Sequence, residues 1–188
     1  MAVKRLASAI LGAALLLAGC GASEPPRVTE RRLTDQPAPR GEPLLRAAML
    51  AGHNVARAEL GEAPLTWDAR LAADAATYAQ VLARTGVFRH ADQPIDMSRE
   101  GENLFTGTRD AYSYREMVDL WVAEKRDFVN RPTPNFSRGG KWEGVAHYTQ
   151  IVWRGTTHIG CALASNRTDD YLVCRYSPPG NVMGEAAF

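Results

Sequence analysis

The stretch IGCALASNRTDDYLVCRY, from Ile159 to Tyr176, predicts the hairpin around which the fold is built. Two runs rich in apolar, β-branched and aromatic residues flank the polar segment NRTD, which is typical of a turn between two strands. With Arg167 and Thr168 as the loop residues, Cys161 lies directly opposite Cys174. Opposed residues of antiparallel strands have Cβ atoms about 4.5–5.5 Å apart, which is close enough to adjust to a disulfide. We therefore predict a hairpin that is closed by a Cys161–Cys174 disulfide.

Two helical patterns lie far upstream of this hairpin. Residues from Pro43 to Leu60 are mostly good helix formers, with the proline in the first turn and Gly61 as a stop signal. A second helix follows, which is capped by Thr66 or Asp68 and ended by Gly86. Its larger apolar and small residues recur at helical spacing: Leu71, Ala75, Tyr78, Ala79 and Leu82.

A third predicted helix has a carboxylate on its apolar face. The helix opens with Ser113, and Glu116 three residues later completes a capping box. One face of this helix carries Met117, Leu120, Trp121, Glu124 and Phe128, so the acidic residue Glu124 interrupts an otherwise apolar stripe. Burying the Glu124 carboxylate alone is costly, so this residue needs a partner. The partner is either a lysine or arginine at the edge of the core or another residue of a functional site.

The stretch HYTQIVW, from His147 to Trp153, is rich in β-branched and aromatic residues, and we interpret it as a further strand. Helices in the first two thirds of the chain and antiparallel strands in the last third predict an α+β fold with helices packed on a sheet.

Composition limits the class of protein. The chain has 188 residues, 45% of them hydrophobic, which suits one domain with a core and an appendage. Its 22 lysines and arginines balance 21 acidic residues, so we expect no nucleic-acid partner. Beyond the N-terminus, the sequence contains no apolar stretch long enough to span a membrane.

The N-terminus has the pattern of a secretory signal. Lys4 and Arg5 precede an apolar run from Leu6 to Ala18, and small residues lead to Cys20 in LLAGC. This ending is similar to a bacterial lipobox, so we predict a lipoprotein signal peptide over residues 1–20 with lipidation of Cys20. The alternative is ordinary cleavage near Ala22 with an incidental cysteine. A lipid anchor would place the protein outside the cytoplasm, at the outer membrane or the cell surface.

Two segments follow the predicted signal peptide, a tether and a folded domain. Residues 21–42 contain several prolines and many charges, and we predict a flexible or extended tether there. Residues 43–188 form the predicted folded domain. Because Cys20 is assigned to lipid, Cys161 and Cys174 remain as the pair that an oxidising compartment would join.

Each of the four histidines, taken singly, is better explained by structure than by ligand binding. His53 lies in the first predicted helix and is expected to be structural, and His158 lies in a predicted turn as a solvated or hydrogen-bonded residue. His90 is placed in a loop and His147 at the start of the predicted strand. Spacing alone does not bring them to Glu102 or Glu124.

Several motifs together resemble the CAP superfamily of cysteine-rich secretory proteins, venom allergens and plant pathogenesis-related proteins. They occur in the family's order from about Leu44 to the C-terminus: HNVARAELGEAPLTWDARLAADAATYA, GENLF, LWVAEKRDF, AHYTQIVWRGTT and YLVCRYSPPGN. The resemblance implies a three-layer α–β–α sandwich with a central antiparallel sheet. It also implies a cleft tetrad formed by His90, Glu102, Glu124 and His147.

The resemblance further implies zinc or another divalent metal on His90 and His147, with the two carboxylates and water nearby. We therefore favour a monomeric, membrane-anchored binding module for a lipid or another cell-envelope component. An alternative is a metal-assisted hydrolase of a peptide or cell-wall glycan, in which Glu102 and Glu124 would be catalytic. In a third interpretation, the tetrad is structural and supports loops that bind a partner.

Overall fold

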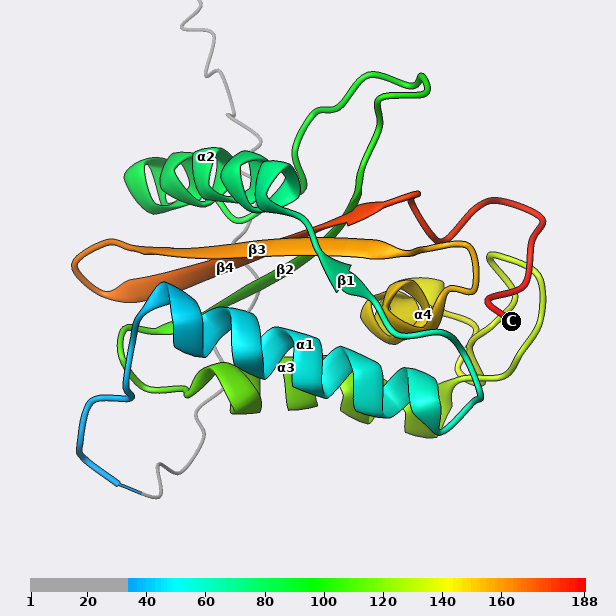
Figure 1. Ribbon diagram of the computed structural model, residues 1–188, viewed down its shortest axis with the longest axis horizontal. Helices are drawn as coiled ribbons and strands as arrows, with labels where there is room; N and C mark the ends of the chain where they lie inside the picture. Colours follow the sequence, from blue (N-terminus) through cyan, green and yellow to red (C-terminus); the bar gives the residue numbers. More distant parts are fainter. Residues whose placement is uncertain (1–33) are drawn as a thin grey trace, which may run out of the picture.

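The computed structural model describes residues 34–188, which fold into three layers with a four-stranded sheet in the middle (Figure 1). In spatial order the strands are β1 (Thr66–Trp67), β3 (His158–Ser165), β4 (Asp169–Ser177) and β2 (Gly101–Thr108). Helix α2 (Ala69–Thr85) covers one face; α1 (Glu42–Ala58), α3 (Tyr114–Ala123) and α4 (Ala146–Val152) form the other layer. The predicted α+β sandwich is confirmed.

The signal peptide assigned to residues 1–20, the lipidation at Cys20 and the tether up to residue 33 lie outside the described residues. No helix in residues 34–188 is long and apolar enough to cross a membrane.

The hairpin has the predicted register. Cys161 pairs with Cys174 in the β3–β4 ladder, and their sulfurs form a disulfide with a Cα–Cα distance of 4.1 Å. Strand β2 pairs antiparallel with β4, whereas the two-residue strand β1 runs parallel to β3. The sheet is therefore mixed rather than wholly antiparallel, because the α1–α2 connection adds a short strand at its edge.

Local signals set the ends of the helices as expected. The Asp68 side chain accepts hydrogen bonds from the backbone amides of Arg70 and Leu71 at the start of α2. Gly86 ends α2 with a φ of 70°, which favours glycine. Ser113 and Glu116 form the predicted capping box of α3. Two 3₁₀ turns, Glu124–Asp127 and Trp142–Val145, connect α3 to α4.

The predicted strand at HYTQIVW is wrong, because residues Ala146–Val152 form helix α4. Tyr148, Ile151 and Val152 are buried in the core that α1 and α3 share with the sheet. Their i, i+3 and i+4 spacing suits a helix, and tertiary packing overrides the β propensity of the stretch.

Helix α2 lies very close to β3. A Cβ on Gly160 would come within 2.2 Å of the Ala72 amide nitrogen, so this crossing requires glycine. Beyond the crossing, Ala75, Ala79 and Leu82 pack on Val173 of the sheet. The alanines keep the helix close to the sheet along its length.

Two buried polar side chains fasten α1 to the sheet and to the end of α4. His53 is fully buried; its Nδ1 lies 2.7 Å from the Met49 carbonyl oxygen and its Nε2 lies 2.8 Å from the Tyr176 hydroxyl. Arg57 donates to four backbone carbonyl groups: those of Ala63, Ile151, Trp153 and Thr156. The structural role expected for His53 is confirmed.

The end of the predicted tether contacts the domain. The Arg40 guanidinium lies 2.6 Å from the buried Asp170 carboxylate and donates to the Tyr112 carbonyl. Helix α1 begins two residues later, at Glu42. The chain therefore enters the domain at the end of β2 where Gly107 pairs with Asp170.

Candidate functional site

One His–Glu pair lies where the chain enters β2. Glu102 is the second residue of the strand, and its side chain is 4% exposed. Its Oε1 lies 2.6 Å from Nδ1 of His90 and accepts a hydrogen bond from the Ala91 amide. His90 belongs to the loop between α2 and β2, and its side chain is 66% exposed. The buried carboxylate therefore holds a solvent-facing imidazole by one nitrogen.

Arg175 contacts the other oxygen of the same carboxylate. It lies opposite Glu102 in the β2–β4 ladder, and its Nη2 is 2.8 Å from Glu102 Oε2. This contact has ion-pair distance but not hydrogen-bond geometry, since Oε2 counts among the buried atoms without a hydrogen-bond partner. The positive charge of Arg175 compensates the burial of the Glu102 carboxylate.

A second His–Glu pair joins the end of α3 to the start of α4. Helix α3 ends at Ala123, so Glu124 opens the following 3₁₀ turn instead of continuing the predicted stripe. Its Oε1 lies 2.6 Å from Nδ1 of His147, and its Oε2 accepts hydrogen bonds from the His147 and Tyr148 amides. Glu124 thus satisfies free amides at the helix N-terminus, and the Trp121 ring stacks on the imidazole at 5.7 Å.

The two pairs lie on either side of the first residues of β2. Side chains alternate along a strand, so Glu102 and Arg175 face the α2 layer, whereas Asn103 faces the opposite layer. There the Asn103 amide donates a 3.1 Å hydrogen bond to the His147 carbonyl. The structure therefore links the four predicted residues through β2 as two separate pairs. Within residues 34–188, no three His, Cys, Asp or Glu side chains converge as a metal-binding group.

Each histidine presents Nδ1 to its carboxylate, so in the neutral imidazole Nδ1 carries the proton and Nε2 the lone pair. A carboxylate that accepts the N–H of one ring nitrogen while the other nitrogen faces a ligand is the usual support for a metal-binding imidazole. The donor set of each pair therefore fits one imidazole ligand of a metal ion, with the carboxylate as its support. It does not form a site with three or four protein ligands.

A neighbouring carboxylate has a perturbed pKa. Burial raises the pKa of Glu100, and the nearby Asp74 carboxylate adds to this, although Arg175 and Arg70 act in the opposite direction. Glu100 directly precedes β2, and it is 8% exposed. Sequence reasoning missed both Glu100 and Arg175, because only the β2–β4 register brings them together. The available signal was a charged residue between the apolar Cys174 and Tyr176 of a buried strand.

The fold is a three-layer α–β–α sandwich with one disulfide, and comparison with known proteins identifies its family. The family model described as "CAP: Cysteine-rich secretory protein family" matches residues 50–176. The chain belongs to this family.

Among relatives, the chain is 41% identical over 137 residues to a pathogenesis-related protein of PR-1 type from Sambucus nigra, covering 72% of this chain and 77% of that protein. It is 39% identical over 140 residues to pathogenesis-related protein 1C from Nicotiana tabacum, covering 74% and 78%.

Solved structures share the fold. The crystal structure of NaASP2 with Zn²⁺ superposes with a TM-score of 0.63 at 24% identity, covering 82% of this chain and 88% of that chain. The structure of BmVAL-1 gives 0.64 at 24% identity, covering 82% and 86%. The secretory family and the disulfide are both consistent with a location outside the cytoplasm.

Proposed function

We propose that this protein is an anchored extracytoplasmic binding module in which His90 and His147 bind a divalent metal ion. The observation that carries the metal assignment is the pairing of each Nδ1 with a carboxylate at 2.6 Å. Zinc suits neutral imidazole ligands, and the ion would supply Lewis acidity at a solvent-accessible position. His90 and His147 would hold it, while Glu102 and Glu124 orient the rings. NaASP2, a protein of the same fold, was crystallised with Zn²⁺.

Zinc titration calorimetry on the protein without residues 1–33 tests this proposal. We expect one site that is lost in both His90→Ala and His147→Ala. His158→Ala is the matched control. His158 is exposed, and within residues 34–188 the hydrogen bond of its Nδ1 is made with the hydroxyl of the neighbouring Thr157 and with no carboxylate. Equal binding in the intact protein and the two site variants would refute the assignment, and so would loss of binding in the control.

The point where the described chain joins the domain supports the binding role. Arg40 fastens the chain beside Asp170, which pairs with Gly107, five residues along β2 from Glu102. At about 3.4 Å per residue this places the His–Glu pairs about 17 Å from the entry of the tether. The point where the described chain joins the domain therefore lies at the other end of β2 from the His–Glu pairs.

Membrane fractionation tests the anchor. The full chain is expected in the membrane fraction with a lipid on its N-terminal cysteine, detected by mass spectrometry. Cys20→Ala should release the folded domain into the soluble fraction. Recovery of both forms in the same fraction would exclude lipidation as the anchor.

A hydrolase that uses Glu102 and Glu124 is less well supported. Both oxygens of Glu124 already accept hydrogen bonds, two of them from backbone amides that a moving proton would disturb. Glu102 is held by His90 on one oxygen and faces Arg175 with the other. A general acid or base needs an oxygen that reaches substrate, and these carboxylates are engaged in orienting the histidines.

A further inference from the structure

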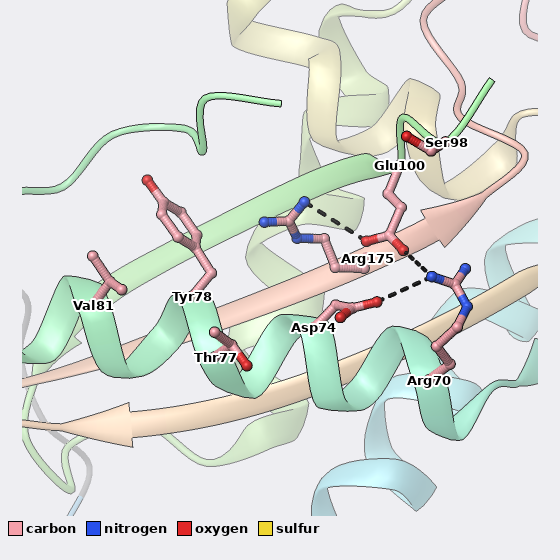
Figure 2. Close-up of a pocket in the computed structure, with 8 residues that line it drawn as sticks. All are labelled: Arg70, Asp74, Thr77, Tyr78, Val81, Ser98, Glu100 and Arg175. Carbon is pink, nitrogen blue, oxygen red and sulfur yellow. Dashed lines mark hydrogen bonds and ion pairs between the residues drawn. The ribbon is translucent and has the colours of Figure 1, made fainter. Parts of the chain in front are cut away.

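A pocket of about 350 Å³ lies between α2 and the chain that enters β2 (Figure 2), and one of its lining residues, Arg175, contacts Glu102 of the His90–Glu102 pair. Its volume lies at the low end of the range of about 300–1,000 Å³ for small-molecule sites. The walls come from α2 and from the segment just before β2, and β4 contributes to the floor. The lining residues are Arg70, Asp74, Thr77, Tyr78, Val81, Ser98, Glu100 and Arg175.

The floor of the pocket consists of two buried charged side chains. Arg175 is 5% exposed and Glu100 is 8% exposed. Nη1 of Arg175 lies 3.7 Å from a Glu100 carboxylate oxygen, and its guanidinium lies 5.4 Å from the centre of the Tyr78 ring. In the described part of the chain, Nε of Arg175 has no hydrogen-bond partner. A buried donor without an acceptor is costly, and an oxygen of a ligand or of an ordered water would relieve this cost.

The rim of the pocket is polar and accessible. Arg70 is 66% exposed and bridges the carboxylates of Asp74, at 3.1 Å, and Glu100, at 2.9 Å. The Thr77 and Ser98 hydroxyls donate to other groups, and both keep lone pairs that can accept a hydrogen bond. Figure 2 shows the carboxylates and guanidinium groups clustered above α2.

The balance of charge identifies the chemistry of the ligand. Among the lining residues, the positive charges of Arg70 and Arg175 are balanced by the carboxylates of Asp74 and Glu100, so the pocket has no excess of positive charge. Such a pocket disfavours a phosphate or a carboxylate. A neutral ligand with many hydroxyl groups suits it, because each hydroxyl can donate to a carboxylate and accept from a guanidinium.

We propose that this pocket binds a saccharide of one or two rings, with Arg175 and Glu100 at its floor and Arg70 and Asp74 at its rim. Sugar hydroxyls would form hydrogen bonds that bridge the carboxylates and the guanidinium groups of these side chains. A ring oxygen or a hydroxyl would accept a hydrogen bond from Arg175 Nε. Val81 supplies an apolar contact for the C–H groups of a sugar ring. The proposal gives a chemical class to the ligand of the binding module and in that sense rests on the proposed function.

Arg175 also couples the pocket to the His90–Glu102 pair. Its guanidinium contacts Glu100 with one nitrogen and Glu102 with another. A ligand that draws the guanidinium toward the pocket weakens its contact with Glu102, which in turn holds His90 Nδ1. Binding of a saccharide is therefore expected to shift the His90 ring resonances, although His90 does not line the pocket.

The test is a titration followed by nuclear magnetic resonance, with N-acetylglucosamine and cellobiose as probes and inorganic phosphate as the anionic comparison. We expect saturable shifts of the Arg175 Nε–H signal and of the α2 amides around Thr77 with at least one saccharide. Arg70→Gln should weaken binding about tenfold, since one charge-assisted hydrogen bond is lost. Arg84→Gln is the matched control: an exposed α2 arginine that does not line the pocket, changed in the same way.

Absence of saturable shifts with both saccharides overturns the proposal, as does a response to phosphate alone. An equal loss of affinity in Arg70→Gln and Arg84→Gln also overturns it, because the effect would then be a general change of charge. Both arginines are exposed, so these variants are expected to fold. The titration follows the Arg175 Nε–H signal without added metal. A negative result would therefore contradict saccharide binding without bearing on zinc binding at His90 and His147.

Discussion

Two buried polar arrangements, one on each face of the sheet, differ in how completely their groups are hydrogen-bonded. On the face covered by α1, α3 and α4, both ring nitrogens of His53 have partners, and Arg57 donates to four carbonyl groups. On the face covered by α2, Nε of the buried Arg175 and one oxygen of Glu102 have no hydrogen-bond partner among the described residues. In the first arrangement these groups are hydrogen-bonded within the protein, whereas in the second some polar atoms are left that a ligand could hydrogen-bond.

This difference separates stability from binding. Satisfied buried networks hold a fold in one arrangement, and breaking them leaves several groups unpaired at once. Partly satisfied groups beside an accessible pocket are the usual location of function. Changes on the α1 face are therefore expected to cost stability, and changes at the rim of the α2 face are expected to cost affinity.

The largest effect is expected for Arg57→Met. The substitution removes the donors of four carbonyl groups, three of them in buried hydrogen bonds, and each unsatisfied buried group costs about 1–3 kcal/mol. We expect a loss of at least about 3 kcal/mol in the free energy of unfolding, measured by urea denaturation. Arg57→Lys keeps the charge and part of the donor capacity, so it should be less damaging. A loss below about 1 kcal/mol for Arg57→Met would show that water replaces the guanidinium.

The second largest loss of stability is expected when the disulfide is removed. Cys161 and Cys174 close a short loop within the β3–β4 hairpin, with a sequence separation of 13. Cys161→Ser is expected to lower the free energy of unfolding by about 2–4 kcal/mol, because the unfolded chain regains the freedom that the cross-link removes. Thermal unfolding under oxidising conditions measures it. An unchanged melting temperature would contradict the prediction.

His53 predicts how stability depends on pH. Burial lowers the pKa of His53 from its ordinary value of 6.5 to about 4 in the folded protein. The unfolded chain therefore binds a proton first, and the stability associated with neutral His53 is complete above pH 6.5 and lost as pH falls toward 4. The full shift corresponds to about 3 kcal/mol. In urea denaturation between these two pH values, His53→Gln should flatten the dependence, whereas the exposed control His158→Gln should retain it. Parallel pH profiles for the native protein and His53→Gln would exclude this linkage.

Prediction from sequence succeeded where the signal was local. The Cys161–Cys174 pairing followed from the turn between the strands, and the Asp68 cap followed from its position before an amphipathic segment. The prediction of a strand failed for Ala146–Val152. This segment is helical because the Glu124 side chain accepts hydrogen bonds at its N-terminus and because its apolar residues pack on α1. The fold could be predicted largely from such signals and from resemblance.

The candidate site was less predictable because its contacts are non-local. The resemblance named His90 and Glu102, and the structure pairs them at 2.6 Å. It did not name Arg175, which meets Glu100 and Glu102 only through the register of β2 on β4. A sequence shows that a buried strand carries a charge, but not which carboxylate compensates it.

The smallest change in stability is expected at the rim of the α2 face. Arg70 is 66% exposed, and solvent screens its ion pairs with Asp74 and Glu100. Arg70→Gln should therefore lower the free energy of unfolding by less than about 1 kcal/mol, a change close to that of the control Arg84→Gln in the same urea measurement. A loss of several kcal/mol would mean that Arg70 is needed to compensate the buried Glu100, so that the pocket is a structural ion-pair network. A small loss in Arg70→Gln, beside a large one in Arg57→Met, would show that the buried network on the α1 face stabilises the fold and that the rim of the α2 face does not.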